Sequence, residues 1–427
     1  MATCKNVQNI GAIDCIGRGF ESCISTTYDH SLNDVNCTFC GQCIESCPTG
    51  ALHEKENIND VWAKLKDPDT FVVVQTAPSV RVALGEEFGM EIGTNVTGKM
   101  VSALKALGFD KVFDTNTGAD FTIMEEATEF VKRFKENDNL PMTTSCCPGW
   151  VRFAEMEYPE NLPHLSSCKS PHQMFGAIIK SYYAEKNNID PSKIYVVSVM
   201  PCIAKKYESQ REEMEVNGAR DVDSVITTRE LARMIKQANI EFDKLEDDTF
   251  DNPMGEATGA AAIFGVTGGV MEAALRTAYE LITGEELQKL EFEDVRGAKG
   301  IKKATIKIGD KEVKVAVAHG LGNARKIMEE IKNGTADYSF VEVMACPGGC
   351  IMGGGQPIKN SKTRMTVDVA GKRAAAMYSI DERSTIRKSH ENPILKEIYK
   401  DYIGKPGEHK AHELLHTHYT PMEEYRI

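Results

Sequence analysis

Short apolar runs alternate with amphipathic helical patterns from about residue 56 onward. The runs that predict strands are Phe71 to Gln75, Lys111 to Asp114, Ile194 to Met200 and Phe340 to Met344. Apolar spacing of the helical type occurs at Met100 to Leu107 and at Thr122 to Lys135. Continuous apolar strands joined by helical crossovers are typical of parallel sheets that are buried on both faces. The sequence therefore predicts an α/β fold, with parallel sheets flanked by helices.

The length of 427 residues predicts more than one lobe, because single cores rarely grow past about 250 to 300 residues. A cysteine-rich region over residues 1–55 precedes the alternating pattern. We expect a first lobe over 56–205, a second over 206–374, and a helical, polar segment over 375–427 that packs on them. Within the second lobe, Ile301 to Val317 alternates at period two around Gly309 and Asp310, which predicts a hairpin.

Composition narrows the classes of function. A formal net charge of -13 argues against a nucleic-acid surface. No apolar run reaches the roughly 18 residues of a membrane span, and the N-terminus has no signal-like apolar region, so we expect a cytoplasmic protein without a membrane span. In such a compartment thirteen cysteines are expected to be metal ligands more often than disulfide partners.

The N-terminal region ends in a dense cysteine run with the spacing CxxCxxCxxxCP. Its members are Cys37, Cys40, Cys43 and Cys47, followed by Pro48. This spacing is that of bacterial ferredoxins, in which the first three thiolates hold one cubane and the fourth ligates another cluster. The run predicts a 4Fe-4S cluster here.

Three further cysteine-bearing segments each follow an apolar run at the end of a predicted strand. They are MTTSCCPGW at 142–150, VVSVMPCIAKKYE at 196–208 and FVEVMACPGGCIMGGGQP at 340–357. Ligand loops gather at the carboxyl ends of parallel strands, so we expect one convergent site. Cys147, Cys202, Cys346 and Cys350 are the candidate ligands, and their wide separation favours a buried cluster over a zinc ribbon. The glycines of the third segment permit a tight backbone around a bulky ligand.

These three segments together resemble the signature motifs of the catalytic subunit of FeFe hydrogenases, as TSCCPGW, MPCxxKxxE and ExMxCxxGCxxGGGQP. The resemblance runs from about residue 4 to HKAHELLHTHY near the C-terminus. It implies a hydrogenase that reversibly reduces protons to hydrogen. It also implies a hydrogen cluster (H-cluster) in which Cys147, Cys202, Cys346 and Cys350 hold a 4Fe-4S cubane. Cys350 would bridge to a two-iron subcluster with carbon monoxide, cyanide and azadithiolate ligands, built by maturases.

The resemblance also implies roles around that cluster. Lys205 and Ser79 would donate hydrogen bonds to the cyanides, and Met200, Met344 and Phe264 would form the cavity wall. The implied proton relay consists of Cys146, Glu126, Ser166, Glu129 and Arg133. The spacing supports part of it, because Glu126, Glu129 and Arg133 lie three and four residues apart on one predicted helix face.

By the same resemblance, Cys4 would complete the accessory 4Fe-4S cluster with Cys37, Cys40 and Cys43. Cys47 would then be a spare thiol; the alternatives are that it replaces Cys4 or serves a cluster supplied by a partner chain. Electrons would enter here from a ferredoxin, a flavodoxin or a partner subunit. Cys15 and Cys23 match no ligand position, and we expect them to be buried as small apolar side chains.

Three rival classes of protein share some of these features. A non-enzymatic iron–sulfur assembly scaffold would not need Cys146, the two relay glutamates or Lys205. A hydrogen sensor would usually carry a signalling domain, and a plain ferredoxin would end near Thr49. The sequence thus favours an enzyme. The closing histidines, His409, His412, His416 and His418, could suggest a metal site, but a surface helix end is the favoured interpretation and the resemblance implies no metal there.

Overall fold

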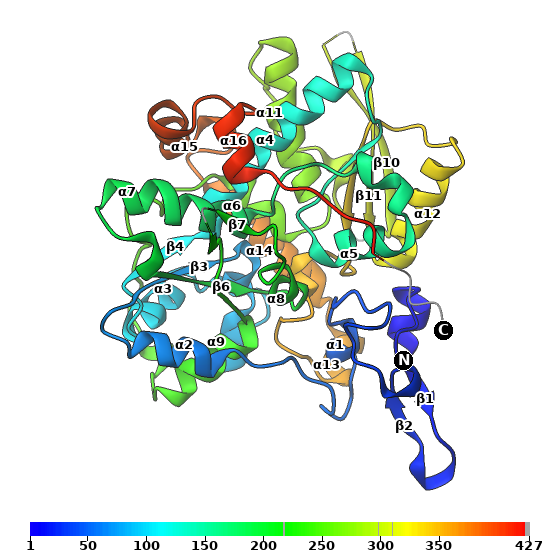
Figure 1. Cartoon of the computed structure of the whole chain (residues 1–427), viewed down its shortest axis with the longest axis vertical. Coiled ribbons are helices and arrows are strands. Elements are labelled where there is room, and N and C mark those ends of the chain that lie inside the picture. The colour runs from blue at the N-terminus through cyan, green and yellow to red at the C-terminus, as the bar shows by residue number, and fades with distance from the viewer. Residues whose placement is uncertain (217, 298, 310, 423–427) are drawn as a thin grey trace.

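Two four-stranded sheets form the centre of the protein (Figure 1). The structure is a computed structural model that describes residues 1–216, 218–297, 299–309 and 311–422. The first sheet is entirely parallel and contains, in spatial order, β4 (Lys111–Asp114), β3 (Phe71–Thr76), β6 (Ile194–Met200) and β9 (Ser224–Thr227). The second contains β10 (Ile301–Ile308), β11 (Lys311–His319), β12 (Phe340–Met344) and β5 (Met142–Thr143). In the second sheet only β10 and β11 are antiparallel.

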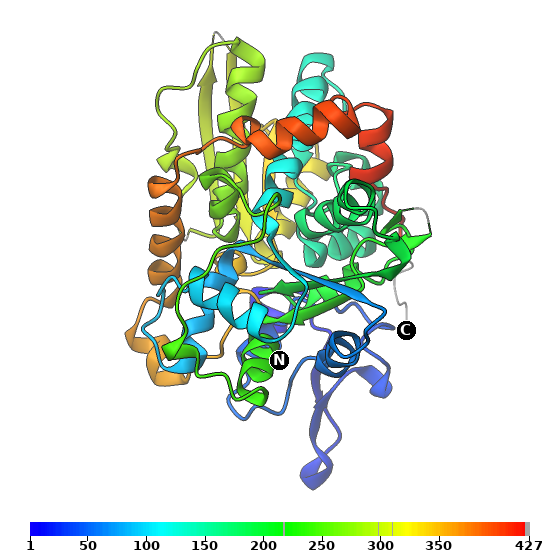
Figure 2. The ribbon, with the colours of Figure 1, turned by 90° about the vertical axis from the view of Figure 1, so that its left-hand side faces the viewer.

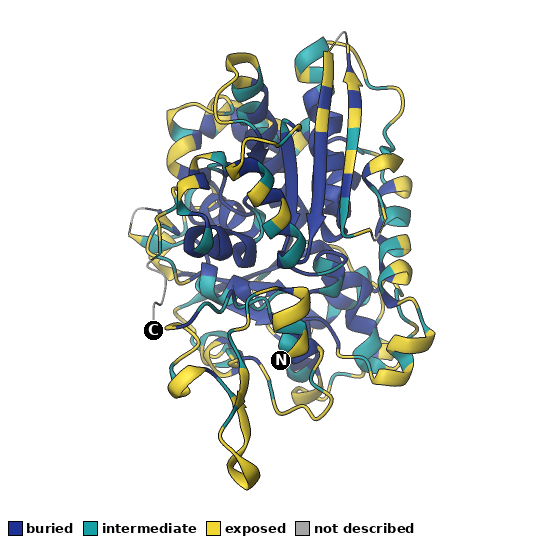
Figure 3. Ribbon diagram, turned by 90° about the vertical axis from the view of Figure 1, so that its right-hand side faces the viewer, coloured by how far each residue is buried: buried dark blue, intermediate teal, exposed yellow. Residues whose placement is uncertain are grey.

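The central strands β3, β6 and β12 are buried on both faces, which confirms the predicted α/β class, whereas the edge strand β10 alternates between buried and exposed residues. In β11, Val313, Val315 and Val317 face α4 (Thr115–Glu136) and α11 (Gly269–Thr283). The alternate residues Ala316 and Ala318 face α5 (Pro148–Glu157) and α12 (Leu321–Lys332). Such two-sided burial is why these strands are continuously apolar at the centre of the sheet. In Figure 3 the central strands are dark blue, whereas two outer strands carry bands of exposed residues.

Helix α4 is the long central helix, and its packing explains several small residues. The Asp114 side chain caps its N-terminus by accepting from the Asn116 backbone N–H. Gly118 lets α6 (Pro171–Ile178) approach, since a Cβ there would lie 2.3 Å from the Pro171 carbonyl oxygen. Helix α15 (Pro393–Ile398) contacts α4, and the orange-red segment that contains it crosses the upper part of the molecule in Figure 2. The remaining α-helices are α1 (Gln42–Glu45), α2 (Ile58–Leu65), α3 (Thr97–Ala106), α7 (Ala184–Lys186), α8 (Ala204–Glu208), α9 (Thr228–Gln237), α10 (Gly259–Ala262), α13 (Ser361–Thr366), α14 (Val369–Arg383) and α16 (His409–Leu415).

A buried ion-pair network ties α14 to the core. Arg276 of α11 donates to both carboxylate oxygens of Asp381 in α14, at 2.9 and 2.8 Å, and to Glu272 at 2.7 Å. All three side chains are fully buried, and two further arginines complete the network: Arg296 pairs with Glu272 and Arg387 pairs with Asp381, each at 2.7 Å.

The two sheets do not follow the expected lobe boundary at residue 205. Strand β5 belongs to the sheet formed mainly by residues 301–344, and β9 belongs to the sheet that begins with β3. Each expected lobe therefore contributes one strand to the other's sheet. The division into 1–55, 56–205, 206–374 and 375–427 stays a prediction.

The hairpin expected within 301–317 is present as β10 and β11, paired from Ile301 with Ala318 to Ile308 with Lys311. Asp310, at its expected turn, lies outside the described residues. Two short two-stranded sheets complete the strands: β1 (Asp14–Ile16) with β2 (Cys23–Ser25), and β7 (Glu215–Val216) with β8 (Ala219–Arg220). No helix of the described residues is long and apolar enough to cross a bilayer.

The prediction that Cys15 and Cys23 are buried is wrong. Both are exposed, on the β1–β2 hairpin that projects away from the body of the molecule (Figures 1 and 3). A two-stranded ribbon has no core of its own, so neither face offers a place to bury a side chain.

Candidate active site

Three loops meet between the two sheets and line a cavity of about 80 Å³. Cys146 and Cys147 follow β5, Cys202 follows β6, and Cys350 comes from the segment after β12; all four line the cavity. Cys346 is buried beside Cys147, Cys202 and Cys350, close enough for their charges to act on one another. The structure thus brings together the four cysteines expected to be cubane ligands.

Glycines permit the third loop to pack against the second. A Cβ on Gly353 would lie 2.2 Å from the Pro201 carbonyl oxygen, immediately before Cys202. Gly349 has a φ of +94°, and a Cβ there would lie 2.6 Å from the Thr267 backbone nitrogen. No other residue fits these positions without a backbone shift, so the glycine run is what allows the Cys350 loop to lie against the Cys202 loop.

The donor set fits an iron–sulfur cluster. All thirteen cysteines are free thiols. Burial raises the pKa of Cys202 to about 12 and the pKa of Cys147 above its usual range, with the Cys147 charge adding to the effect on Cys202. Thiolates in so dry a place need a cation to compensate them, and four soft sulfur donors suit iron–sulfur chemistry.

The rest of the cavity fits a cofactor with anionic and apolar parts. Met200, Met344 and Phe264 line it, as the resemblance implied. Ser79 also lines it, and the buried Ser79 hydroxyl has no hydrogen-bond partner within the described part of the chain. A buried hydroxyl without a partner is rare in proteins and marks a place where a ligand can accept its hydrogen bond.

Lys205 is buried, with 9% of its surface exposed, so it is not a solvated residue at a helix start. Its Nζ donates to the Cys146 carbonyl oxygen at 3.0 Å and to Glu208 Oε2 at 2.9 Å. Burial lowers the pKa of Lys205, but the charges of Glu208 and Cys202 outweigh burial and raise the pKa above its usual value. A charged ammonium therefore faces the cavity.

Two members of this network were not foreseen from the sequence. His172 lines the cavity and binds Glu208 Oε2 through Nε2 at 2.6 Å, and it contacts Ser198 Oγ through Nδ1 at 3.2 Å. Burial and the Lys205 charge lower the pKa of His172 to about 4, so the imidazole is neutral at pH 7. Glu208 could have been identified from the sequence, because it is the last residue of the MPCxxKxxE motif. The sequence around His172 contains no comparable motif.

The expected relay residues form a line from the cavity toward the surface. Glu126 is fully buried on α4, and neither of its carboxylate oxygens has a hydrogen-bond partner among the residues described. Burial and the neighbouring Glu129 carboxylate raise the pKa of Glu126 to about 8. Beyond it, Ser166 Oγ donates to Glu129 Oε2 at 3.0 Å. On the cavity side, burial and the Glu126 charge raise the pKa of Cys146 well above its usual value.

The outer end of this line is an ion pair. Arg133 Nη2 lies 2.6 Å from Glu129 Oε1, and its side chain is 14% exposed. The guanidinium also donates to the carbonyl oxygens of Pro163 and Leu165, at 2.9 and 3.0 Å. Arg133 therefore lies just beneath the surface, held in place by three partners.

The N-terminal cysteines divide into two environments. Cys4 is close enough to Cys37 and Cys43 for its charge to raise the pKa of both thiols, although burial is the larger cause. Cys47 has a different surrounding, since hydrogen bonds from the Thr49 hydroxyl and from backbone N–H groups lower its pKa to about 6.

The N-terminal cysteine run touches the active-site loop. Cys346 Sγ lies 3.9 Å from the Cys40 carbonyl oxygen. A Cβ on Gly354 would come within 2.5 Å of that same oxygen, and Gly41 beside it has a φ of +71°. Two glycines therefore allow the two ligand loops to come into backbone contact.

The expectation that the closing histidines lie on a surface is wrong for His416. His409, His412 and His418 are exposed, but His416 is buried just after α16. Its Nδ1 lies 2.8 Å from Ser167 Oγ, and its Nε2 lies 3.0 Å from Glu125 Oε2. Leu414 and Leu415 pack into the hydrophobic core, so the next residue, His416, is buried as well. The polar sequence of this helix end does not indicate that burial.

Four clustered thiols between two mainly parallel sheets, beside a ferredoxin-type cysteine run, are typical of an iron–sulfur oxidoreductase. Comparison with known protein families identifies the kind of iron–sulfur oxidoreductase. The C-terminal domain of the iron-only hydrogenase large subunit matches residues 70–354, the iron hydrogenase small subunit matches 367–422, and a 4Fe-4S binding domain matches 32–53. The chain belongs to the iron-only, or FeFe, hydrogenase family, whose members are oxidoreductases acting on hydrogen and carry the H-cluster.

Relatives extend this match over most of the chain. The NADP-reducing hydrogenase subunit HndD of Solidesulfovibrio fructosivorans is 54% identical over 422 residues, which is 97% of this chain and 71% of that protein. Iron hydrogenase 1 of Clostridium pasteurianum is 52% identical over 87% of this chain and 65% of that protein. A solved structure of the [FeFe]-hydrogenase HydA1 from Chlamydomonas reinhardtii superposes with a TM-score of 0.76 at 43% identity, covering 86% of this chain and 99% of that one.

Proposed function

We propose that this hydrogenase interconverts protons and hydrogen with protons carried by Cys146, Glu126, Ser166, Glu129 and Arg133, and with electrons entering at the N-terminal cysteines. Cys147, Cys202, Cys346 and Cys350 would hold the cubane of the H-cluster. When bound, that cofactor supplies the open iron at which protons and electrons combine. The chain supplies the surroundings, and the observation that carries the proposal is the unpartnered, buried carboxyl of Glu126.

The cavity residues position and shield the cofactor. Lys205, held by Glu208, and the free hydroxyl of Ser79 would donate to anionic ligands, because a desolvated ammonium gives a strong charge-assisted hydrogen bond. Met200, Met344 and Phe264 exclude water with apolar surface.

Proton transfer follows from the order of the acidic groups. Cys146 lines the cavity and Glu126 acts on it from the buried side, while Ser166 links onward to Glu129. With a pKa of about 8, Glu126 is near its midpoint at neutral to slightly alkaline pH, which is where a general acid or base works best. Rotation of the Ser166 hydroxyl between Glu126 and Glu129 would complete the transfer.

Electron entry follows from the contact between the two ligand loops. We assign Cys4, with Cys37, Cys40 and Cys43, to the accessory 4Fe-4S cluster, because Cys4 is the additional thiol that acts on this group. Cys47 is then outside the ligand set. The donor is proposed to be a ferredoxin, a flavodoxin or a partner subunit; the relative HndD is named as one subunit of an NADP-reducing hydrogenase, which favours a subunit.

A second candidate, iron–sulfur assembly, has one observation in its favour. Protein NAR1 of Arabidopsis thaliana is 33% identical over 92% of this chain, and a cytosolic Fe-S cluster assembly factor of Xenopus tropicalis is 31% identical. The presence of Cys146, Glu126 and Lys205 around one cavity supports catalysis instead.

The test compares wild type with Cys146→Ala, each matured with the two-iron subcluster. We expect both to show the infrared bands of metal-bound carbon monoxide and cyanide, and only wild type to turn over hydrogen. Cys15→Ala, which changes an exposed thiol on the β1–β2 hairpin outside the cavity lining, is the control and should stay active. Bands absent from wild type would favour assembly; a fully active Cys146→Ala would remove Cys146 from the relay.

A further inference from the structure

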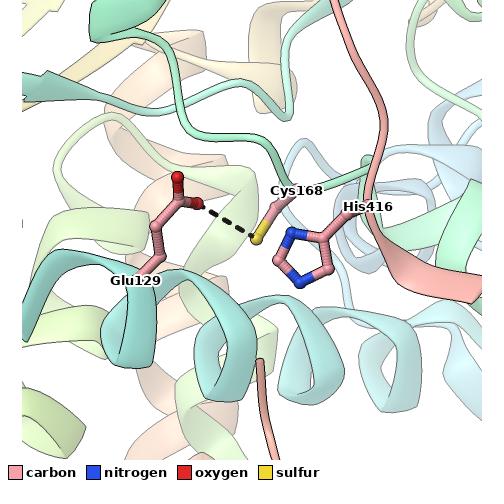
Figure 4. A group of neighbouring side chains, drawn as sticks. All are labelled: Glu129, Cys168 and His416. Carbon is pink, nitrogen blue, oxygen red and sulfur yellow. Dashed lines mark hydrogen bonds between the residues drawn. The ribbon is translucent and has the colours of Figure 1, made fainter. Parts of the chain in front are cut away.

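Glu129, Cys168 and His416 form a cluster that the proposed mechanism does not use as a unit (Figure 4). They come from three separate segments: Glu129 from α4, Cys168 from the loop before α6, and His416 from the residue after α16. One ligand atom of each lies within 4.8 Å of the others, and Cys168 Sγ lies 3.9 Å from Glu129 Oε2. Cys168 and His416 are buried.

The chemistry of the three groups suits a borderline-soft divalent cation of the zinc class. Thiolate, imidazole and carboxylate are the three ligand types that zinc uses, with a water or open position as the fourth. Bond lengths of about 2.0 to 2.3 Å place tetrahedral ligands about 3.5 Å apart, so the side chains need to close by only about 1 Å. Magnesium and calcium, which prefer oxygen ligands, do not suit a sulfur and nitrogen pair.

The surroundings favour a cation as well. The carboxylates of Glu129 and Glu125 both lie close enough to Cys168 to act on it electrostatically, and so concentrate negative charge there. Glu125 binds His416 Nε2, the usual way in which an outer carboxylate orients a metal-bound imidazole. This leaves His416 Nδ1, now 2.8 Å from Ser167 Oγ, as the nitrogen available to an ion.

We propose that Glu129, Cys168 and His416 bind a zinc-class divalent cation that inhibits hydrogen turnover. Binding breaks the Cys168 S–H bond, forms a sulfur–metal bond and releases the proton to solvent, with no change in oxidation state. The ion takes Glu129 Oε2, the oxygen to which Ser166 donates, and so interrupts the line from Glu126 to Arg133. The inhibitory part rests on the proposed relay.

Zinc binding is measured on the anaerobic, matured protein by competition with a chromophoric chelator, with zinc-edge X-ray absorption to identify the ligands. Cys168→Ala and His416→Ala should each weaken the site at least about 10-fold. Cys15→Ala and His418→Ala, which change an exposed thiol and an exposed imidazole, should leave it unchanged. Unaltered carbon monoxide and cyanide bands in every variant show that the fold and cofactor are intact. Equal zinc affinity in all five proteins would overturn the site.

A second measurement, of hydrogen turnover, tests zinc binding at this site separately from the proposed proton relay. Each protein's hydrogen turnover with zinc is compared with its own turnover without zinc, and a chelator is then added. We expect reversible inhibition in wild type and both controls, and at least about 10-fold more zinc needed in Cys168→Ala and His416→Ala. If Cys168→Ala and His416→Ala lose zinc binding but zinc does not inhibit wild type, the cation site would be confirmed and proton transfer through Glu129 would be refuted.

Discussion

Replacing Glu126 by Gln removes the titrating proton and preserves the shape of the side chain. In wild type, burial and the Glu129 charge raise the pKa of Glu126 from 4.5 to about 8. The difference corresponds to about 5 kcal/mol in favour of the protonated form, at about 1.4 kcal/mol per pH unit. At pH 7 about nine tenths of the molecules would hold this proton, so the carboxyl is poised as a donor.

The same proton affects stability, with a definite sign. Below pH of about 4.5 the folded and unfolded chains both hold it; between about 4.5 and 8 only the folded chain does. The free energy of unfolding of wild type therefore falls as pH rises through this window, relative to Glu126→Gln. Turnover should fall by about 10² to 10⁴-fold in Glu126→Gln, the usual contribution of a general acid or base.

The assay is an infrared pH titration that follows the carbonyl stretch of protonated carboxyl groups. A band with a midpoint near pH 8 is expected in wild type and should be missing from Glu126→Gln. Glu136→Gln, at the exposed end of the same helix, is the control. A Glu126 midpoint near 4.5, or full turnover in Glu126→Gln with carbon monoxide and cyanide bands unchanged, would refute the reasoning.

Four further substitutions test the ligand loops and the core. Cys4→Ser should lose the electron paramagnetic resonance signal of the accessory cluster while Cys47→Ser retains it; the reverse result would make Cys47 the ligand. Gly353→Ala should lower the free energy of unfolding by about 1 to 3 kcal/mol and reduce cubane iron, because its Cβ would collide with the Pro201 carbonyl. Arg276→Met should cost about 1 to 3 kcal/mol in denaturant unfolding, because buried Glu272 and Asp381 would each keep one arginine partner, Arg296 and Arg387, but lose their hydrogen bonds to Arg276. No measurable cost would show that Arg296 and Arg387 are sufficient partners.

The exposed pair Lys244 and Glu241 provides the matched control for Arg276. Both side chains are 67% exposed, and their contact is 2.8 Å long. Water screens such a pair, so Lys244→Ala should change the free energy of unfolding by no more than about 1 kcal/mol.

The parts of the fold that could be predicted are those that depend on the pattern of neighbouring residues in the sequence. The apolar runs of β3, β6 and β12 were evident, because a central parallel strand is buried on both faces. A strand before Cys146 was expected as well, but without bounds, since the two residues of β5 form a strand only through pairing with β12. The candidate ligand cysteines could also be identified from local sequence, because each lies in a short segment with a distinctive motif.

Contacts between distant segments could not be predicted. His172 and Glu208 are 36 residues apart, and nothing near His172 indicates that it meets a carboxylate. His416 follows a polar helix end, yet the packing of the last turn of α16 carries it to Glu125, 291 residues earlier. Both histidines acquire their roles from tertiary packing alone.

The exchange of β5 and β9 between the two sheets has a consequence for how the molecule can be divided. A cut at residue 205 would leave the C-terminal piece without the edge strand β5 and the N-terminal piece without the edge strand β9. Neither piece would contain a complete sheet, and the four cubane cysteines would be split between them. We therefore expect that the two halves cannot be expressed, shuffled between relatives or reassembled from fragments as independent modules.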